Sequence, residues 1–221
     1  MKARVSGVPY EVELPPNKVR IVSFTPQIEK TIAYLARVSN PANQDNEEYE
    51  QLIRYLIKHE HWSPFEMANV TMEINCTRDI GRQILRHRSF TFQEFSQRYA
   101  QSQDFEYAEC RMQDTKNRQN SYACTDKELA NLWTEAQQKV MKLVREHYQW
   151  ALSVGIAKEQ ARKILPEGLT MSKMYMSGTL RSWIHYVMLR TKADTQKEHR
   201  EIALECKERL TEICPTIMRS L

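Results

Sequence analysis

Alternating apolar and polar positions predict strands in three parts of the chain. Residues 19–24 have the composition of a strand, and residues 70–76 place an apolar side chain at every second position. The second pattern predicts a half-exposed strand that leads toward Arg82. Residues 169–177 predict a third strand, rich in methionine and therefore in flexible apolar side chains.

Apolar residues at helical spacing, with their start and stop signals, predict the helices. The longest opens with a Thr-Asp-Lys-Glu capping box at residues 125–128, and its wide apolar stripe predicts the spine of the core and a candidate subunit contact. On that stripe His147 is expected to be a buried, hydrogen-bonded histidine. Residues 101–124 show little periodicity and predict a surface excursion or a mobile lid. The helical ranges expected are 25–37, 46–59, 82–88, 125–150, 157–165, the stretch from 179, and 196–214.

Composition limits the class of protein. The 221 residues are 41% hydrophobic and 27% charged, which is typical of a globular protein with its own core. The net charge of +4 agrees with small anionic ligands and is too small to require nucleic acid. No apolar run approaches the length of a membrane span, and no signal peptide precedes Lys2 and Arg4. Five scattered cysteines without a Cys-x-x-Cys pair predict reduced thiols and a cytoplasmic location.

Two common ligand sites are not expected from the sequence. The five glycines form neither a dinucleotide-binding Gly-x-Gly-x-x-Gly nor a phosphate-binding loop. A nucleotide would therefore be held by side chains and helix ends. His59 and His61 form a His-x-His pair, but no third ligand follows at metal-binding spacing, so no metal site is expected.

Residues 82–99 concentrate polar groups and aromatic rings in one stretch. They include four arginines, one histidine, one carboxylate and four aromatic side chains. If Glu94, Ser96 and Arg98 are extended, their side chains point to one side of the strand. The arginines upstream would form an anion clamp, because a planar guanidinium can bind two phosphate oxygens at once.

Other interpretations of this stretch stay open on its chemistry alone. Glu94 and Arg98 stand four residues apart, as in an ordinary ion pair on a helix surface. Residues 86–88 could form a solvated basic patch or contact single-stranded nucleic acid, with the nearby aromatic rings as stacking platforms. A nucleic-acid module would bind with steep salt dependence and would carry no chromophore.

Three separated segments resemble the flavin-dependent thymidylate synthases, in the order found in that family. The first is the Arg-His-Arg of residues 86–88, preceded by Arg82-Gln83 and followed after seven residues by Ser96-Gln97-Arg98-Tyr99. The second is the His-x-Ser-Pro-Phe-Glu of residues 61–66, and the third covers residues 177–190. The resemblance extends over nearly the full length. It implies an α+β fold in which an antiparallel sheet packs with long helices, as one domain over residues 1–221.

The resemblance also implies an activity. The enzyme would make dTMP by reductive methylation of dUMP, with methylenetetrahydrofolate as the carbon donor and NADPH as the reductant acting through FAD. It would be a homotetramer with active sites at its subunit contacts and would use neither nucleic acid nor a membrane. No cysteine lies in the three segments, so covalent attack by a thiol is not expected. The alternative is a relative that keeps the fold and binds FAD without turning over dUMP.

Individual residues take their roles from the same resemblance. Arg190 is expected to be catalytic, because a cation at the uracil edge favours loss of the N3 proton. Arg162 is expected to reach the nucleotide of a neighbouring subunit, His61 to line the flavin and folate side, and residues 36–39 to lie near the site. The residues expected to bind the flavin are Ser63, Arg86, His87, Arg88, Glu94, Thr179, Leu180, Arg181 and His185. The residues expected to bind dUMP are Gln83, Arg86, Glu94, Phe95, Ser96, Gln97, Arg98, Arg162 and Arg190.

Overall fold

The computed structural model describes residues 18–101 and 104–221. Its strands are β1 (Val19–Phe24), β2 (Asn69–Thr77), β3 (Thr91–Glu94), β4 (Arg111–Gln113), β5 (Ser121–Ala123) and β6 (Met171–Thr179). Its α-helices are α1 (Ile28–Ala36), α2 (Glu50–Lys58), α3 (Arg78–Ile84), α4 (Lys127–Ser153), α5 (Lys158–Ala161), α6 (Leu180–Arg190), α7 (Lys197–Ile213) and α8 (Pro215–Arg219). Three short 3₁₀ helices are η1 (Pro41–Asn43), η2 (Ser63–Met67) and η3 (Arg162–Ile164).

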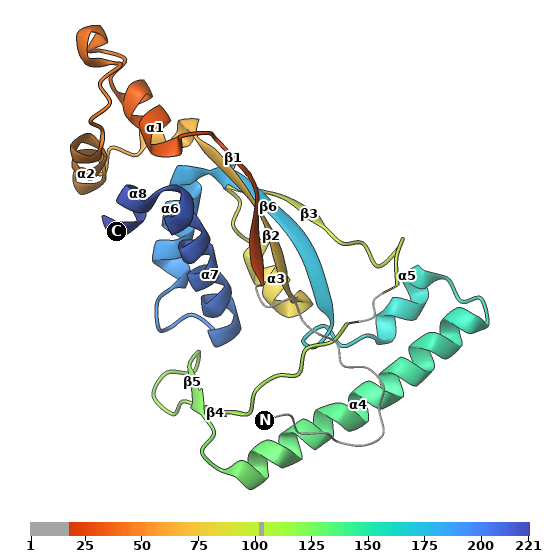
Figure 1. Ribbon diagram of the computed structural model, residues 1–221. Coiled ribbons are helices and arrows are strands. Elements are labelled where there is room, and N and C mark those ends of the chain that lie inside the picture. Colours follow the sequence, from red (N-terminus) through yellow and green to blue (C-terminus); the bar gives the residue numbers. More distant parts are fainter. Residues whose placement is uncertain (1–17, 102–103) are drawn as a thin grey trace, which may run out of the picture.

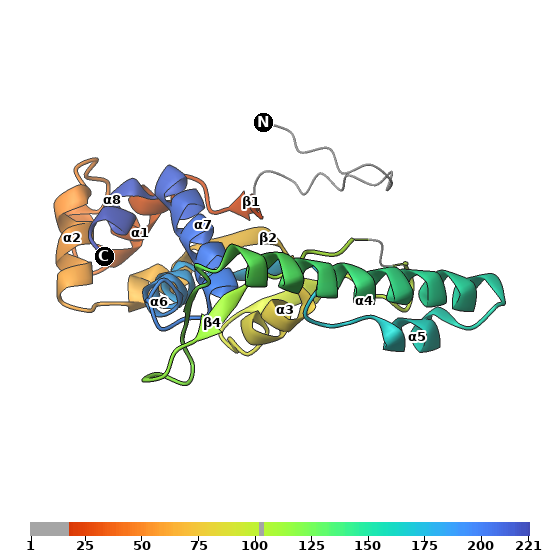
Figure 2. The same ribbon diagram turned by 90° about the horizontal axis from the view of Figure 1, so that it is seen from below.

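A four-stranded antiparallel sheet with strand order β1-β2-β6-β3 forms the centre of the molecule (Figure 1). Helices α6 and α7 lie on one side of this sheet, and α4 runs as a long separate rod along the molecule (Figures 1 and 2). The β2 and β6 strands pair over nine residues, from Asn69 opposite Thr179 to Thr77 opposite Met171. The predicted α+β class with an antiparallel sheet is confirmed.

The interior of the sheet is more buried than its alternating sequence predicts. Met72 and Ile74 point into the core with no exposed surface, as expected from the alternation. On the other face Glu73 is only 6% exposed, because Arg20 and Lys173 from the flanking strands pair with it at 2.6 and 3.6 Å. Thr71 and Asn75 on this face are partly exposed, so the expected half-exposed strand is confirmed except at Glu73.

Two predicted helix starts differ from the structure. The helix expected from residue 46 begins only at Glu50, because the Arg37 guanidinium binds the carbonyls of Asn46 and Glu48. Asn46 also accepts the Glu48 N–H with its side chain, which holds a turn in place of the first helical turn. The expected capping box is displaced by one residue: Asp126, not Thr125, accepts the N–H groups that open α4.

The core lies between the sheet and the helices of the amino- and carboxyl-terminal parts of the chain. Trp183 of α6 is fully buried and donates its indole N–H to the Val70 carbonyl at 3.0 Å, which fixes α6 against β2. Helix α7 follows its expected range and buries Ile202, Cys206 and Leu210 in the same core.

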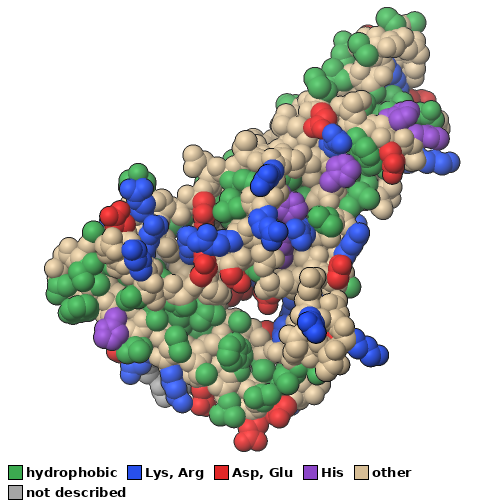
Figure 3. Space-filling view, turned by 180° about the vertical axis from the view of Figure 1, so that it is seen from behind, with side chains coloured by type: hydrophobic (Ala, Val, Ile, Leu, Met, Phe, Trp, Pro, Cys, Tyr) green, Lys and Arg blue, Asp and Glu red, His purple; other side chains and the backbone are tan. Residues whose placement is uncertain are grey.

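Helix α4 contradicts the expectation that it is the spine of this core. Its predicted apolar stripe is exposed, with Leu132, Leu143 and Trp150 each more than half accessible. His147 is exposed too, so it is not a core histidine. The periodicity correctly marks a helix with an apolar face, but it does not say which surface covers that face. Figure 3 shows hydrophobic side chains gathered over the part of the molecule where α4 lies.

Part of the polar segment 101–124 is ordered as a hairpin. Strands β4 and β5 pair from Arg111 opposite Ala123 to Gln113 opposite Ser121. Phe105 also forms an isolated bridge with Thr170, next to β6. The expected surface excursion therefore contains local structure, and residues 102–103 lie outside the described residues. Across the helices of residues 18–101 and 104–221, none combines the length and apolar character needed to cross a membrane.

Candidate functional site

The Arg-His-Arg triplet follows directly after α3 in a loop that is anchored on α6. Helix α3 ends at Ile84, so the helix expected up to about Arg88 is shorter and the triplet is not helical. Phe90, only 7% exposed, packs against Trp183 with ring centroids 4.8 Å apart. The Ser182 hydroxyl donates to the Ser89 carbonyl at 3.3 Å. These two contacts fix the loop that carries the triplet.

This loop lies tightly on the backbone of β6. A Cβ atom added at Gly178 would come within 2.5 Å of the Phe90 ring, so the close contact needs a residue without a side chain. Packing of Phe90 on the sheet therefore determines where the chain leaves the triplet.

Arg190, the expected catalytic residue, lies beside the middle residue of the triplet. Its Nε donates to Nε2 of His87 at 3.0 Å. Burial, followed by the charges of Arg190 and Arg86, lowers the pKa of His87 to about 4. His87 is therefore neutral near pH 7, and its ring orients the Arg190 guanidinium while leaving the positive charge of Arg190 uncompensated.

Behind this pair lies a polar cluster that the sequence interpretation missed. His199 of α7 has no exposed surface, and its ring nitrogens face the Tyr186 hydroxyl at 3.2 Å and the Gln83 side chain at 3.3 Å. The Gln83 amide also donates to Gln196 at 2.7 Å. Helix α7 was expected to serve packing only. The signal that could have revealed the cluster is His199, which stands three residues before Ile202 and so lies beside the apolar stripe of the helix.

Both arginines of the triplet are exposed cations. Arg86 and Arg88 are exposed and form no ion pair with any residue of 18–101 or 104–221. Their neighbour Arg82, in contrast, is paired with Glu167. Figure 3 shows Lys and Arg side chains gathered in the middle of one face, with histidine side chains beside them. Unpaired guanidiniums next to buried aromatic rings are a donor set suited to phosphate groups.

The segment after β3 does not form the one-sided polar strand that was expected. Extended structure ends at Glu94, and Ser96 begins a turn in which its carbonyl accepts the Tyr99 N–H. Glu94 points inward and accepts hydrogen bonds from Arg78 at 3.3 Å and Ser172 at 3.0 Å. Arg98 instead pairs with Glu159 at 3.7 Å. Glu94 and Arg98 therefore do not form a surface helix pair either.

Around that turn, two more expected dUMP-binding residues have different surroundings. Gln97 is only 4% exposed, and its Nε2 has no hydrogen-bond partner within the described chain. Phe95 is 37% exposed. A buried amide without a partner is unusual in a folded protein.

The amino-terminal end of α6 forms a second group of expected flavin-binding residues. Thr179 caps the helix by accepting the Ser182 N–H, and Glu66 of η2 bonds to both Thr179 and Arg181 at 2.7 and 2.6 Å. Hydrogen bonding from Arg181, then from Thr179, lowers the pKa of Glu66. Leu180 is fully buried and its N–H donates to Ala68, so it has neither a side chain nor an N–H free for a ligand.

Histidines line the surface next to this helix end. His185 is exposed on α6 and its ring lies 5.0 Å from that of Trp62. His61 and Ser63 are also exposed, and the His61 ring packs edge-on against Tyr55. Thus the second and third sequence segments lie side by side, joined by the contacts of η2 with α6.

Arg162 lies apart from the other expected dUMP-binding residues. It stands at the start of η3 beside α5, at the end of the molecule away from α6 (Figure 1). Within one chain the structure therefore brings Arg86, His87, Gln83 and Arg190 together but leaves Arg162 outside this group.

The low pKa values of the two histidines predict how stability changes with pH. Burial is also the main cause that lowers the pKa of His199 to about 4, followed by the charge of Arg190. An unfolded histidine has a pKa of about 6.5. Below that pH these two histidines bind protons in the unfolded chain but stay neutral in the folded chain. The free energy of unfolding therefore falls from about pH 6.5 toward pH 4.

Urea unfolding at pH 7 and pH 5 measures this effect. We expect the loss of stability at pH 5 to be smaller in His199→Gln, whose amide cannot titrate, than in the unchanged protein. His147→Gln, at an exposed position of α4, is the matched control and should keep the full loss. An equal loss in all three proteins would contradict the assignment.

Comparison with known proteins gives the family. The family described as "Thymidylate synthase complementing protein" matches residues 20–216. The flavin-dependent thymidylate synthase of Synechocystis sp. is 47% identical over 213 residues, covering 92% of this chain and 98% of that protein. A probable flavin-dependent thymidylate synthase of Paramecium bursaria Chlorella virus 1 is 48% identical over 195 residues, covering 87% and 90%.

A solved structure with the same fold is the UMP/dUMP methylase PolB from Streptomyces cacaoi, bound with 5-Br dUMP. It superposes with a TM-score of 0.79 at 25% identity, over 91% of this chain and 93% of that one. The matched family covers the triplet, the η2 segment and the start of α6 together. The chain belongs to the thymidylate synthase complementing protein family, the family of the flavin-dependent thymidylate synthases.

Proposed function

We propose that this protein is a flavin-dependent thymidylate synthase that converts dUMP to dTMP, as one domain over residues 1–221. Methylenetetrahydrofolate is the carbon donor and NADPH is the reductant. The observation that carries the proposal is the group of guanidiniums at Arg86, Arg88 and Arg190 around a neutral His87, none of which forms an ion pair with another described residue. Such a group binds anionic ligands and can stabilise negative charge that develops on one of them.

The donor set at this site fits FAD. Arg86 and Arg88 are exposed and unpaired among the described residues, and they would hold the phosphates of the cofactor. Thr179, Arg181 and His185 at the start of α6, with Ser63 of η2, would complete the flavin site. Bound FAD supplies hydride-transfer chemistry, which no amino-acid side chain provides. His87 orients Arg190 and separates the two exposed arginines.

The same arrangement supports dUMP binding. Gln83 is held by His199 and Gln196, so its amide is positioned before a ligand arrives. The Nε2 of Gln97, which has no hydrogen-bond partner among the described residues, would be a further donor. Ser96 and Phe95 lie beside it, whereas Glu94 and Arg98 would have to exchange partners within the chain to reach a nucleotide.

Arg190 is proposed to act on the uracil ring. A guanidinium held against the uracil edge stabilises the anion formed when N3 loses its proton, and this makes C5 a better carbon nucleophile. Burial raises the pKa of the Cys76 thiol to about 12, and it also raises the pKa values of Cys206 and Cys214. These three thiols therefore stay protonated, which supports a route without thiol attack on C6.

A homotetramer accounts for two features of the single chain. The exposed apolar stripe of α4, with Leu132, Leu143 and Trp150, needs a covering surface. Arg162 is separate from Arg190 in one chain, so a site at a subunit contact would bring Arg162 to the dUMP of a neighbour. His61 would line the flavin and folate side of that shared site.

Two measurements test the proposed function. The purified protein should be yellow, with a visible flavin spectrum that NADPH bleaches. It should also release tritium from dUMP labelled at C5 when methylenetetrahydrofolate and NADPH are present. A colourless protein that takes up no FAD would support the nucleic-acid module instead, and bound FAD without tritium release would indicate an inactive relative.

Flavin content also tests the role of the triplet. Replacing Arg88 by Ala removes one of the two exposed cations, and we expect flavin retention to weaken by roughly 10- to 100-fold, as for loss of one charge-assisted contact. The ratio of flavin to protein absorbance after gel filtration measures it. Arg54→Ala, which breaks an exposed ion pair on α2, is the matched control. Equal flavin content in Arg88→Ala and the control would remove Arg88 from the site.

A further inference from the structure

Two cysteines face each other where the β4–β5 hairpin opens. Arg111 pairs with Ala123, so Cys110 and Cys124 are the next residues outward on the two strands. The Cys124 N–H donates to the Cys110 carbonyl at 3.3 Å, which makes them a hydrogen-bonded pair. Residues in such a pair have Cα atoms about 5.5 Å apart. Disulfides span Cα separations of about 4.4–6.8 Å.

The side chains of this pair lie on the same face of the hairpin and are both partly exposed. Opposite residues of an antiparallel ladder point to the same face, so both thiols lie on one side of the hairpin. Local desolvation raises the pKa of Cys110, and a hydrogen bond with the Cys124 thiol raises it further. Both residues are partly exposed, whereas Cys76, Cys206 and Cys214 are buried.

We propose that Cys110 and Cys124 are a redox-modification site that forms a reversible disulfide across the hairpin. In exchange with a low-molecular-weight disulfide such as oxidised glutathione, one cysteine thiolate attacks a sulfur of the reagent and one thiol leaves. The second cysteine thiolate then displaces the remaining half. One disulfide breaks and one forms, the two protons of the cysteines pass to the released thiolates, and the reagent is reduced to two thiols.

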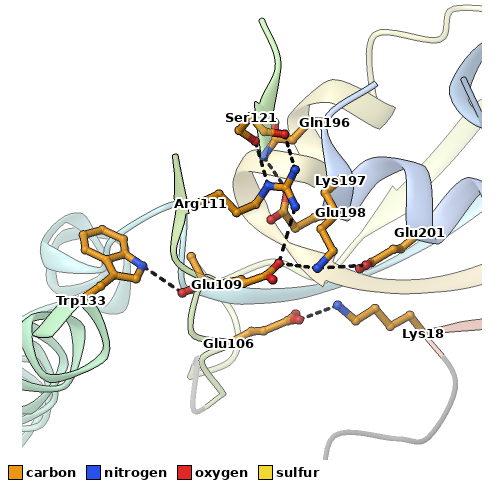
Figure 4. A network of polar contacts seen from close by, with 11 residues as sticks. Lys18, Glu106, Glu109, Arg111, Ser121, Trp133, Gln196, Lys197, Glu198 and Glu201 are labelled. Atoms are coloured by element: carbon orange, nitrogen blue, oxygen red, sulfur yellow. Dashed lines mark hydrogen bonds and ion pairs between the residues drawn. The ribbon is translucent and has the colours of Figure 1, made fainter. Parts of the chain in front are cut away.

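The hairpin contacts the start of α7, next to Gln196 of the polar cluster (Figure 4). Glu109, next to Cys110, pairs with Lys197 at the start of α7, and Arg111 donates to Ser121 across the hairpin. Gln196, next to Lys197, accepts the Gln83 amide at 2.7 Å. A disulfide between Cys110 and Cys124 would therefore link the two strands covalently beside Glu109, the residue that contacts the start of α7. Because the pair is partly exposed, we expect it to be reduced again by dithiols.

Redox titration of the native full-length protein tests the proposal. The protein is equilibrated in buffers with increasing ratios of oxidised to reduced glutathione, the remaining thiols are alkylated, and peptides are mapped by mass spectrometry. We expect one linked peptide pair that joins Cys110 to Cys124, reversed by dithiothreitol, with the three buried cysteines unmodified. In the oxidised protein, amide hydrogen exchange in residues 110–124 should slow by roughly tenfold or more, because the loop is closed.

Single variants distinguish a disulfide from simple thiol capping. Cys110→Ser and Cys124→Ser should each stop at one glutathione adduct on the remaining cysteine, with no linked peptides. Two separate adducts on the unchanged protein, or unreacted Cys110 and Cys124 at the most oxidising ratio, would overturn the proposal. The mapping needs neither flavin nor dUMP, so its failure is distinct from failure of the proposed function.

Discussion

Replacing Arg190 by Ala should lower the rate of dTMP formation by about 100- to 1000-fold, the usual cost of removing one group that stabilises developing charge. The guanidinium is held by a hydrogen bond to a neutral His87, so this contact does not neutralise its positive charge. The loss should appear in kcat rather than in KM, because the interaction strengthens as the uracil ring becomes anionic. Tritium release from labelled dUMP measures the rate.

Two controls separate this role from a structural one. Arg190→Ala should retain its flavin, since the phosphates are assigned to Arg86 and Arg88, and its visible spectrum should be unchanged. Arg54→Ala on α2 should keep both flavin and activity. Full activity in Arg190→Ala would exclude Arg190 from catalysis, and loss of flavin together with activity would assign it to cofactor binding.

Changing two apolar residues of α4 to Glu should dissociate the proposed homotetramer and abolish activity. Leu132 and Leu143 are each 56% exposed in the single chain, so the double variant leaves the core of the chain untouched. Truncating or charging a central apolar contact at an interface costs roughly 2 kcal/mol or more of binding free energy. The two changes together should therefore lower the affinity between subunits by at least about 100-fold. Analytical ultracentrifugation measures the mass of the particle, and tritium release measures its activity.

The matched control for this experiment is another charge change on the same helix. Lys142→Glu alters an exposed polar position next to the stripe and should leave both mass and activity as they are. Circular dichroism at low protein concentration shows whether the double variant still folds. A double variant that remains a tetramer, or an unchanged protein that is active as a monomer, would contradict the proposed assembly.

Local patterns of the sequence predicted most elements of the fold because these patterns act over short distances. Strands β1 and β6 and helix α7 appear close to their expected bounds. The start of α2 could not be predicted, since it depends on Arg37 binding two backbone carbonyls nine and eleven residues away. The covered or exposed state of the α4 stripe also could not be predicted, because periodicity identifies an apolar face without identifying its partner.

The site shows the same division between local and long-range information. The Arg-His-Arg triplet and Arg190 were identified from motifs, and the structure brings His87 and Arg190 into contact across about a hundred residues. His199 was missed because its helix has an ordinary apolar stripe and its polar partners come from α3 and α6. The expected polar strand at Glu94 and Arg98 failed because ion pairs with Arg78 and Glu159 separate the two side chains.

The strand order of the sheet sets a constraint on folding during synthesis. β6 (Met171–Thr179) is the last strand of the sheet in the sequence, but it lies between β2 and β3. Both of these strands leave the ribosome much earlier than β6. Until β6 emerges, β3 has no neighbour with which to pair, and one edge of β2 stays open. Completion of the sheet therefore has to wait for the last third of the polypeptide, and a nascent chain halted before β6 exposes strand edges on which chaperones can act.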